Sequence, residues 1–164
     1  MSETPQFLVE RLLQEGERSC TFFQELPPED WDQVIYSEGA QWTVHQVLAH
    51  FVAAETSLYR LVQNVAAGGG GSPEDFNLDA YNERKVAELA AVPSIELVER
   101  FCQHRQLTAA LVGSLEPADL EKQGRHPFMG LTTLNEMIKL IYRHNQIHQR
   151  EIRQGLKRSG FSGT

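Results

Sequence analysis

The chain has 164 residues, of which 41% are apolar and 23% charged, and its formal net charge at pH 7 is −7. These proportions are ordinary for a globular domain and exclude a collagen-like, low-complexity or intrinsically disordered chain. The acidic balance argues against a nucleic-acid partner, because phosphate contacts need clustered lysines and arginines.

The first predicted helix begins at Pro5 and runs to about Leu26, where a Pro-Pro pair ends it. Proline is tolerated at a first helical position because that N–H has no partner inside the helix. Leucines and Phe23 recur on one side of this segment at helical spacing. A polar connection over residues 29–41 follows, and no alternating run in the chain indicates a strand.

The second predicted helix starts after Trp42, with Thr43 as its N-cap, and stops before the run Gly68–Gly71. We expect that run to be a flexible loop, because a helix does not continue through four glycines. It is not a phosphate-binding loop, because it lacks the Lys-Ser/Thr of that motif. A shorter helix is expected over about Leu78 to Ala91.

The third long helix is expected to begin with Ser94 as its cap, and a loop over residues 124–130 separates it from the fourth. The fourth starts near Thr133, with Glu136 completing a capping box, and ends near Gly155. Four helices with one apolar stripe each predict an all-α four-helix bundle, whose long crossover contains the short extra helix.

The whole chain is expected to form a single domain. Its bundle would span residues 5–156 and be followed by a flexible C-terminal tail. No apolar run approaches the length of a membrane span, and the polar N-terminus does not resemble a secretory signal. Cys20 and Cys102 lie on apolar helix faces without a C-x-x-C motif, so we expect inert core thiols. We therefore expect a cytoplasmic protein with no membrane partner.

Two histidines on the fourth helix are candidate metal ligands. His144 and His148 are four residues apart, so their side chains lie one above the other, with His148 near the centre of the apolar stripe. Burial of two imidazoles is costly unless something satisfies both rings, as a divalent metal does. Surface or hydrogen-bonded histidines are the alternative. Glu151 is either a solvated charge or the partner of a ligand histidine.

Other polar residues leave their roles open. His45 lies off the stripe of the second helix, so we expect it at the surface, and His126 falls in a loop. His50 lies about 120° from the centre of that stripe, so it faces either a neighbouring helix or solvent. Glu55 and Arg105 fall on apolar faces, where a lone charge is costly, and we expect them to pair with each other or with other core polar groups. The alternative for Glu55 is a place in a metal pocket.

The segment from Trp42 to Glu55 resembles the second-helix signature of the DinB-like superfamily, W-[ST]-x-x-x-x-x-x-H-x-x-x-x-E. His144-x-x-x-His148 resembles the H-x-x-x-H of that superfamily on the fourth helix. Residues 77–84, NLDAYNER, resemble a segment of some branches and of the N-terminal domain of mycothiol-dependent maleylpyruvate isomerase. The resemblance covers residues 5–156 and implies a DinB-like four-helix bundle, often a homodimer.

The resemblance also implies a divalent metal site. It carries the three ligand positions onto His50, His144 and His148 and thereby selects the inward orientation for His50. Zinc or nickel is the expected metal, because imidazole ligands suit both.

Known relatives include bacillithiol and mycothiol S-transferases and a thiol-dependent isomerase. The resemblance therefore implies a metal-dependent thiol S-transferase, with a low-molecular-weight thiol as co-substrate and a small electrophile as substrate. Glu55 is the candidate catalytic residue, and Tyr81 and Asn82 are candidates for the pocket, with ordinary packing and capping as their alternative. The alternative functions are a metal-dependent hydrolase, a non-catalytic stress-response protein that binds a small molecule, and a bundle without metal.

Overall fold

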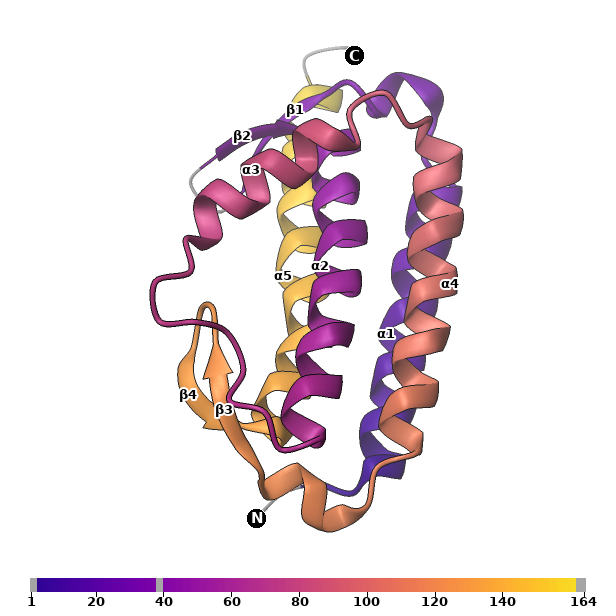
Figure 1. Ribbon diagram of the computed structural model, residues 1–164. Coiled ribbons are helices and arrows are strands. Elements are labelled where there is room, and N and C mark those ends of the chain that lie inside the picture. Colours follow the sequence, from indigo (N-terminus) through magenta and orange to yellow (C-terminus); the bar gives the residue numbers. More distant parts are fainter. Residues whose placement is uncertain (1–2, 38–39, 162–164) are drawn as a thin grey trace.

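The computed structural model describes residues 3–37 and 40–161, and these form four long helices, as predicted. The helices are α1 (Pro5–Gln24), α2 (Val44–Ala66), α4 (Ser94–Gly113) and α5 (Leu134–Phe161). Helix α1 packs against α4 and α5, and α2 packs against the same two helices, so α1 and α2 occupy opposite corners of the bundle (Figure 1). The predicted all-α four-helix bundle is confirmed.

Three of the four predicted long-helix starts are correct, including Pro5 at the start of α1, and one is shifted by a residue. Thr43 caps α2 in a capping box, and the Thr133 hydroxyl accepts the N–H of Glu136 in the first turn of α5. Ser94 is the first residue of α4 rather than its cap, and Pro93 holds the N-cap position without a side-chain hydrogen bond.

The expected end of α5 at Gly155 is wrong, because the helix continues to Phe161. A Cβ atom at Gly155 would lie 2.5 Å from Ile35 Cγ2, so this glycine allows the chain before α2 to pack closely on α5. Of the expected C-terminal tail, residues 157–161 belong to the helix, and residues 162–164 lie outside the described residues.

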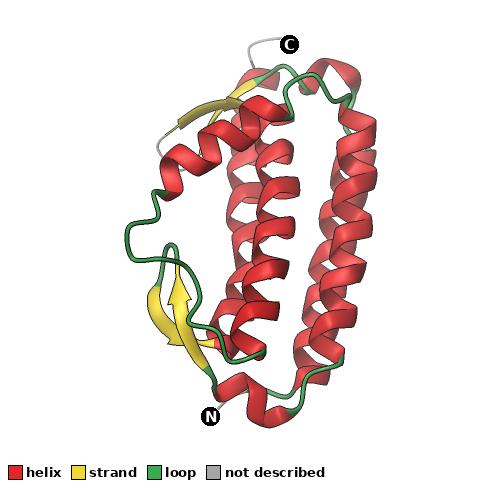
Figure 2. Cartoon of the chain, in the orientation of Figure 1, coloured by secondary structure: helices red, strands yellow, loops and turns green. Residues whose placement is uncertain are grey.

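Two short antiparallel hairpins occur where the sequence indicated only polar connections (Figure 2). The first pairs β1 (Val34–Ser37) with β2 (Ala40–Thr43), and the second pairs β3 (Gln123–His126) with β4 (Gly130–Thr133). Each strand has four residues, which is too short to display an alternating pattern. Each hairpin leads directly into a long helix.

The crossover between α2 and α4 contains α3 (Leu78–Glu88), which packs against α2 (Figure 1). The predicted short helix is therefore present, although it ends three residues before Ala91. The glycine run before it is held against β3: Arg125 N–H donates to Gly70 O at 2.8 Å, and Ser72 N–H donates to Arg125 O at 2.8 Å. The segment is a loop, as predicted, and these backbone hydrogen bonds attach it to β3.

The core consists of two apolar clusters, stacked along the bundle. One contains Leu8, Leu12 and Ile138, and the other contains Phe23, Phe51 and further residues of α2 and α4. No helix of the described residues is both long enough and apolar enough to cross a membrane.

Cys20 of α1 and Cys102 of α4 form a disulfide, so the expectation of two free core thiols is wrong. The two helices pack side by side, and the Cα atoms lie 6.0 Å apart, within the range that a disulfide spans. The cross-link closes a loop with a sequence separation of 82 residues. A loop of that length stabilises the fold by about 4 kcal/mol in the chain-entropy model.

Candidate metal centre

Three histidines from two helices converge inside the described part of the bundle. His50 comes from α2, and His144 and His148 come from successive turns of α5. The Nε2 atom of His144 lies 3.1 Å from Nε2 of His50 and 2.8 Å from Nε2 of His148. His50 and His148 are buried and His144 is half-buried, so the three nitrogens meet away from bulk water.

The inward orientation of His50 follows from the two long helices that pack against α2. Its apolar stripe packs against α4, where the rings of Phe51 and Phe101 lie 5.6 Å apart. The side with His50 packs against α5, where the rings of His50 and His148 lie 5.3 Å apart. Helix α2 is therefore buried on two sides, which a single apolar stripe does not reveal.

Glu151 sets the orientation of His148. Its Oε1 atom lies 3.0 Å from His148 Nδ1, and three quarters of its side chain is buried. A proton on Nδ1 satisfies the carboxylate and leaves the lone pair of Nε2 directed at the other two histidines. Of the two alternatives for Glu151, the structure shows the histidine partner.

The donor set fits a small divalent cation. Ligand nitrogens of a tetrahedral zinc site, at bond lengths of about 2.0–2.1 Å, lie about 3.3 Å from one another. The two Nε2 separations of 3.1 and 2.8 Å are close to that value. Three imidazoles suit zinc, nickel, iron and copper, and three protein ligands leave a position for a substrate.

A cavity of about 690 Å³ opens beside the cluster and is lined in part by His50 and His144. Its walls come from α2, α3, α5, the glycine run and the β3–β4 turn, which lie on the same flank of the bundle (Figure 1). Most of the wall is apolar, with Leu58, Leu61 and Leu140 among its residues. The histidine cluster is thus reached through an apolar pocket.

Tyr81 and Asn82, the candidates for the pocket, both line the cavity. The Tyr81 hydroxyl hydrogen bonds to Ser57 Oγ of α2 and its ring lies 5.2 Å from that of Phe76, so α3 is attached to the cavity wall. These contacts place Tyr81 as a fixed part of the pocket.

Glu55 is buried elsewhere. Arg105 donates through Nε to Glu55 Oε1 at 3.1 Å and through Nη2 to both Glu55 and Asn145, while Thr108 donates to Glu55 Oε2 at 3.1 Å. The predicted pairing of Glu55 with Arg105 is confirmed. Glu55 is not among the described residues that line the cavity, so the structure does not bring this predicted catalytic carboxylate to the site. The opposite charge of Arg105 holds it in the core.

His126 is the site residue that sequence reasoning missed. It belongs to β3, is 5% exposed and lines the cavity. Its Nδ1 accepts the backbone N–H groups of Phe128 at 3.0 Å and Met129 at 3.2 Å. Burial, and then the neighbouring His144, lower the pKa of His126 to about 4. The one indication of this turn in the sequence is the composition of residues 124–130, which is typical of a turn and ends at Gly130.

His45 also differs from expectation. The helical wheel placed it at the surface, but it is half-buried and its Nε2 lies 2.8 Å from the Val92 carbonyl oxygen. This contact ties the start of α2 to the chain before α4, away from the histidine cluster.

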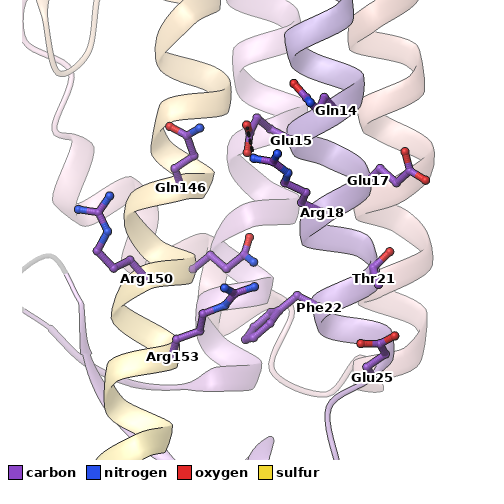
Figure 3. A pocket seen from close by; sticks show the side chains of 11 residues that line it. Gln14, Glu15, Glu17, Arg18, Thr21, Phe22, Glu25, Gln146, Arg150 and Arg153 are labelled. Atoms are coloured by element: carbon purple, nitrogen blue, oxygen red, sulfur yellow. Dashed lines mark hydrogen bonds and ion pairs between the residues drawn. The ribbon is translucent and has the colours of Figure 1, made fainter.

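A second hollow lies between α1 and α5 and is open and polar (Figure 3). Arg153 of α5 points towards α1, and its guanidinium lies 5.1 Å from the centre of the Phe22 ring, whereas Arg150 extends to the other side of α5. The basic end of the chain is thus packed beside its acidic beginning.

Similarity to known proteins extends over most of the chain. The model of the DinB superfamily matches residues 11–152. A protein of Bacillus mycoides (strain KBAB4), provisionally named a metal-dependent hydrolase, is 35% identical over 114 residues, which are 68% of this chain. The match spans 62% of the length of that relative.

Two solved structures share the fold. YfiT from Bacillus subtilis, described as having an unusual four-helix bundle topology and provisionally as a metal-dependent hydrolase, has a TM-score of 0.76 at 18% identity. The likeness covers 95% of this chain and 87% of YfiT. The mycothiol-dependent maleylpyruvate isomerase has a TM-score of 0.74 at 12% identity, over 92% of this chain and 61% of that one. At these identities the likeness concerns the fold alone.

Proposed function

This chain belongs to the DinB superfamily, and we propose that it is a metal-dependent enzyme that joins a low-molecular-weight thiol to a small electrophile. One observation carries the proposal: three histidine Nε2 atoms meet at the wall of an apolar cavity of about 690 Å³. The donor set is that of a catalytic metal site with an open position, and the cavity has room for a substrate beside it.

A metal held by His50, His144 and His148 would supply Lewis acidity, which lowers the pKa of a thiol. The residues of this chain position the reactants. Glu151 holds His148 through its Nδ1 proton, and the leucines of the wall exclude water from the reacting groups. Zinc or nickel is the metal that we propose.

The choice of a thiol as nucleophile rests on the composition of the cavity wall. Asp79 is the one carboxylate among the described lining residues, and it is exposed on α3. Glu55 is held by Arg105 and Thr108. Activation of water would benefit from a buried general base, whereas a thiol loses its proton readily when a metal binds it.

Metal-dependent hydrolysis is the second candidate. It is favoured by the provisional names of the Bacillus mycoides relative and of YfiT. The same three imidazoles and the same open position would serve it. A non-catalytic stress-response protein that holds a small molecule in the cavity uses the same pocket without turnover.

The metal centre is tested first. The purified protein is expected to hold close to one equivalent of zinc or nickel by plasma mass spectrometry. His148→Ala should lose most of this metal, because it removes one of the three ligands. His45→Ala is the matched control, because His45 is a half-buried histidine on α2 outside the cluster. If the protein holds no metal after incubation with zinc and after incubation with nickel, the proposal is contradicted.

The reaction is tested next with the metal-loaded protein. Consumption of cysteine or glutathione together with 1-chloro-2,4-dinitrobenzene, lost in His148→Ala, would support thiol transfer. Hydrolysis of p-nitrophenyl acetate without thiol would support the second candidate instead. Saturable binding of either compound without turnover would identify a binding protein.

The expected cytoplasmic location stays a prediction that the Cys20–Cys102 disulfide does not favour, because disulfides are rare in reducing compartments. Family likeness supports one further proposal, a homodimer. Sedimentation velocity at micromolar concentrations is expected to give a mass near twice the 18.6 kDa of one chain. A single species at the monomer mass would contradict the dimer.

A further inference from the structure

The buried imidazole of His126 is fixed in one tautomer. Its Nδ1 accepts two backbone N–H groups, from Phe128 at 3.0 Å and Met129 at 3.2 Å, across the turn between β3 and β4. A nitrogen that accepts hydrogen bonds has no proton, so the proton of the neutral ring is on Nε2. His126 therefore presents an N–H donor on the side of the ring away from the turn.

That donor has no partner among the described residues. The Nε2 atom of His126 is inaccessible to solvent and makes no hydrogen bond, and the side chain is 5% exposed. An unsatisfied buried donor carries a desolvation penalty, and such groups in native folds usually have a functional reason. His126 lies outside the group of three histidines whose nitrogens meet, but it lines the same cavity.

The strand that carries His126 is held rigidly. A Cβ atom at Gly71 would lie 2.4 Å from Arg125 O and 2.5 Å from Arg125 N, so the glycine run can approach the strand only because it lacks side chains. A Cβ atom at Gly124 would lie 2.6 Å from Val65 Cγ2 of α2, which shows how closely the strand packs on that helix. The backbone on both sides of Arg125 thus fixes the place of the donor relative to α2.

We propose that His126 donates its Nε2 proton to an acceptor oxygen of the substrate and thereby orients the substrate beside the histidine cluster. The substrate class is then an apolar molecule with a carbonyl or carboxyl oxygen, because most of the cavity wall is apolar, with Leu58, Leu61 and Leu140 among its residues. The identification of the occupant as a substrate rests on the proposed function, whereas the donor itself does not depend on a metal.

The substitution His126→Asn separates the two nitrogens of the ring. The Asn oxygen can accept the two N–H groups of the turn, as Asn side chains do in Asx-turns, so the hairpin is expected to persist. The variant has no group at the position of Nε2. His45→Asn is the matched control, since His45 is a half-buried histidine on α2 that does not line the cavity.

Acetophenone and cumene are suitable probes, because they are similar in size and one methyl group of cumene takes the place of the carbonyl oxygen of acetophenone. Their dissociation constants are measured by calorimetry on the full chain, both zinc-loaded and after chelation. The affinity ratio of ketone to hydrocarbon is expected to fall by about 2- to 10-fold in His126→Asn, the worth of one neutral hydrogen bond. The ratio should be unchanged in His45→Asn.

An unchanged ratio in His126→Asn overturns the proposal. If that variant does not fold, nitrogen NMR of the wild-type imidazoles decides: the Nε2 resonance of His126 must show a protonated nitrogen and must shift with acetophenone but not with cumene. A ratio that falls in the chelated protein supports the donor even where no metal-dependent activity is found. Loss of metal binding therefore refutes the proposed function without affecting this result.

Discussion

Two buried polar clusters lie inside this bundle and differ in what completes them. Arg105, Glu55 and Asn145 join opposite charges and an amide in a network whose members are hydrogen-bonded to one another. The second cluster brings together three copies of one base, His50, His144 and His148, at the wall of a cavity. Burial of polar groups does not by itself mark a site, whereas burial of like groups beside a cavity indicates an external ligand.

The largest effect is expected from breaking the first cluster. Arg105 is 1% exposed, and Arg105→Met leaves the Glu55 carboxylate buried without its counter-ion. We expect the free energy of unfolding, measured by urea denaturation, to fall by about 3–5 kcal/mol. Arg100→Met on the same helix removes an exposed ion pair with Glu96 and should cost less than about 1 kcal/mol.

The double variant Glu55→Leu/Arg105→Met tests whether the lost stability comes from the unpaired charge of Glu55. Removal of both charges should recover much of the lost stability, because apolar replacement of a buried ion pair is often neutral. Metal content should remain that of the wild type, since the network lies outside the histidine cluster. Loss of metal from a folded double variant would show that the two clusters depend on each other.

A smaller effect is expected at the edge of the second cluster. Glu151→Gln keeps the size of the side chain but weakens the hold on His148 Nδ1. Removal of such a partner typically costs about 10- to 100-fold in metal affinity, which competition with a chromophoric chelator would measure. Glu136→Gln, at the opposite end of α5, is the control and should leave the affinity unchanged.

The network also requires space on α1. A Cβ atom at Gly16 would lie 2.5 Å from Arg105 Cγ, a contact that real side chains do not make. Gly16→Ala should therefore displace Arg105 and destabilise the fold by about 1–3 kcal/mol, despite the better helix propensity of alanine. Gly113→Ala is the control, because its nearest neighbour would be Val9 Cγ2 at 3.5 Å. Equal stability of both variants would contradict a tight fit at Gly16.

The helices could be predicted from the sequence because each long helix carries its own local signals. Thr43 and Thr133 precede their helices as caps, and prolines and glycines bound several of them. The hairpins could not be predicted from the sequence. Strands of four residues contain too few alternations of apolar and polar residues, and these strands are stabilised by packing on the helices. The disulfide depends on which helices become neighbours, and spacing does not reveal that Cys20 and Cys102 meet.

The candidate site was predictable only where one helix contains it. His144 and His148 are one turn apart on a face that the apolar pattern marks as buried. His50 required the resemblance, because its side of α2 is buried by contacts with α5 that its own sequence does not encode. His126 was missed because its burial comes from a turn and from the glycine run, which are far apart in the sequence.

The smallest effect is a dependence of stability on pH that His126 contributes. Burial, then the neighbouring His144, lower its pKa from 6.5 to about 4. The unfolded chain therefore binds a proton below about pH 6.5 that the folded protein takes up only near pH 4, so acidification between these values favours unfolding. Between pH 7 and pH 5, His126 should lower the free energy of unfolding by an amount on the order of 1–2 kcal/mol.

The variant His126→Asn isolates this contribution, because asparagine does not titrate. Urea denaturation of the chelated wild-type and variant proteins at pH 7 and pH 5 gives the free energy of unfolding that each protein loses on acidification. The difference between the two losses is the contribution of His126 and of its coupling to His144. The wild type should lose more stability than the variant on acidification. Equal losses would mean that the ring of His126 is as accessible to water in the folded protein as in the unfolded chain. The donor would then be hydrated, and His126 would belong with the exposed polar groups of the surface rather than with the buried wall of the cavity.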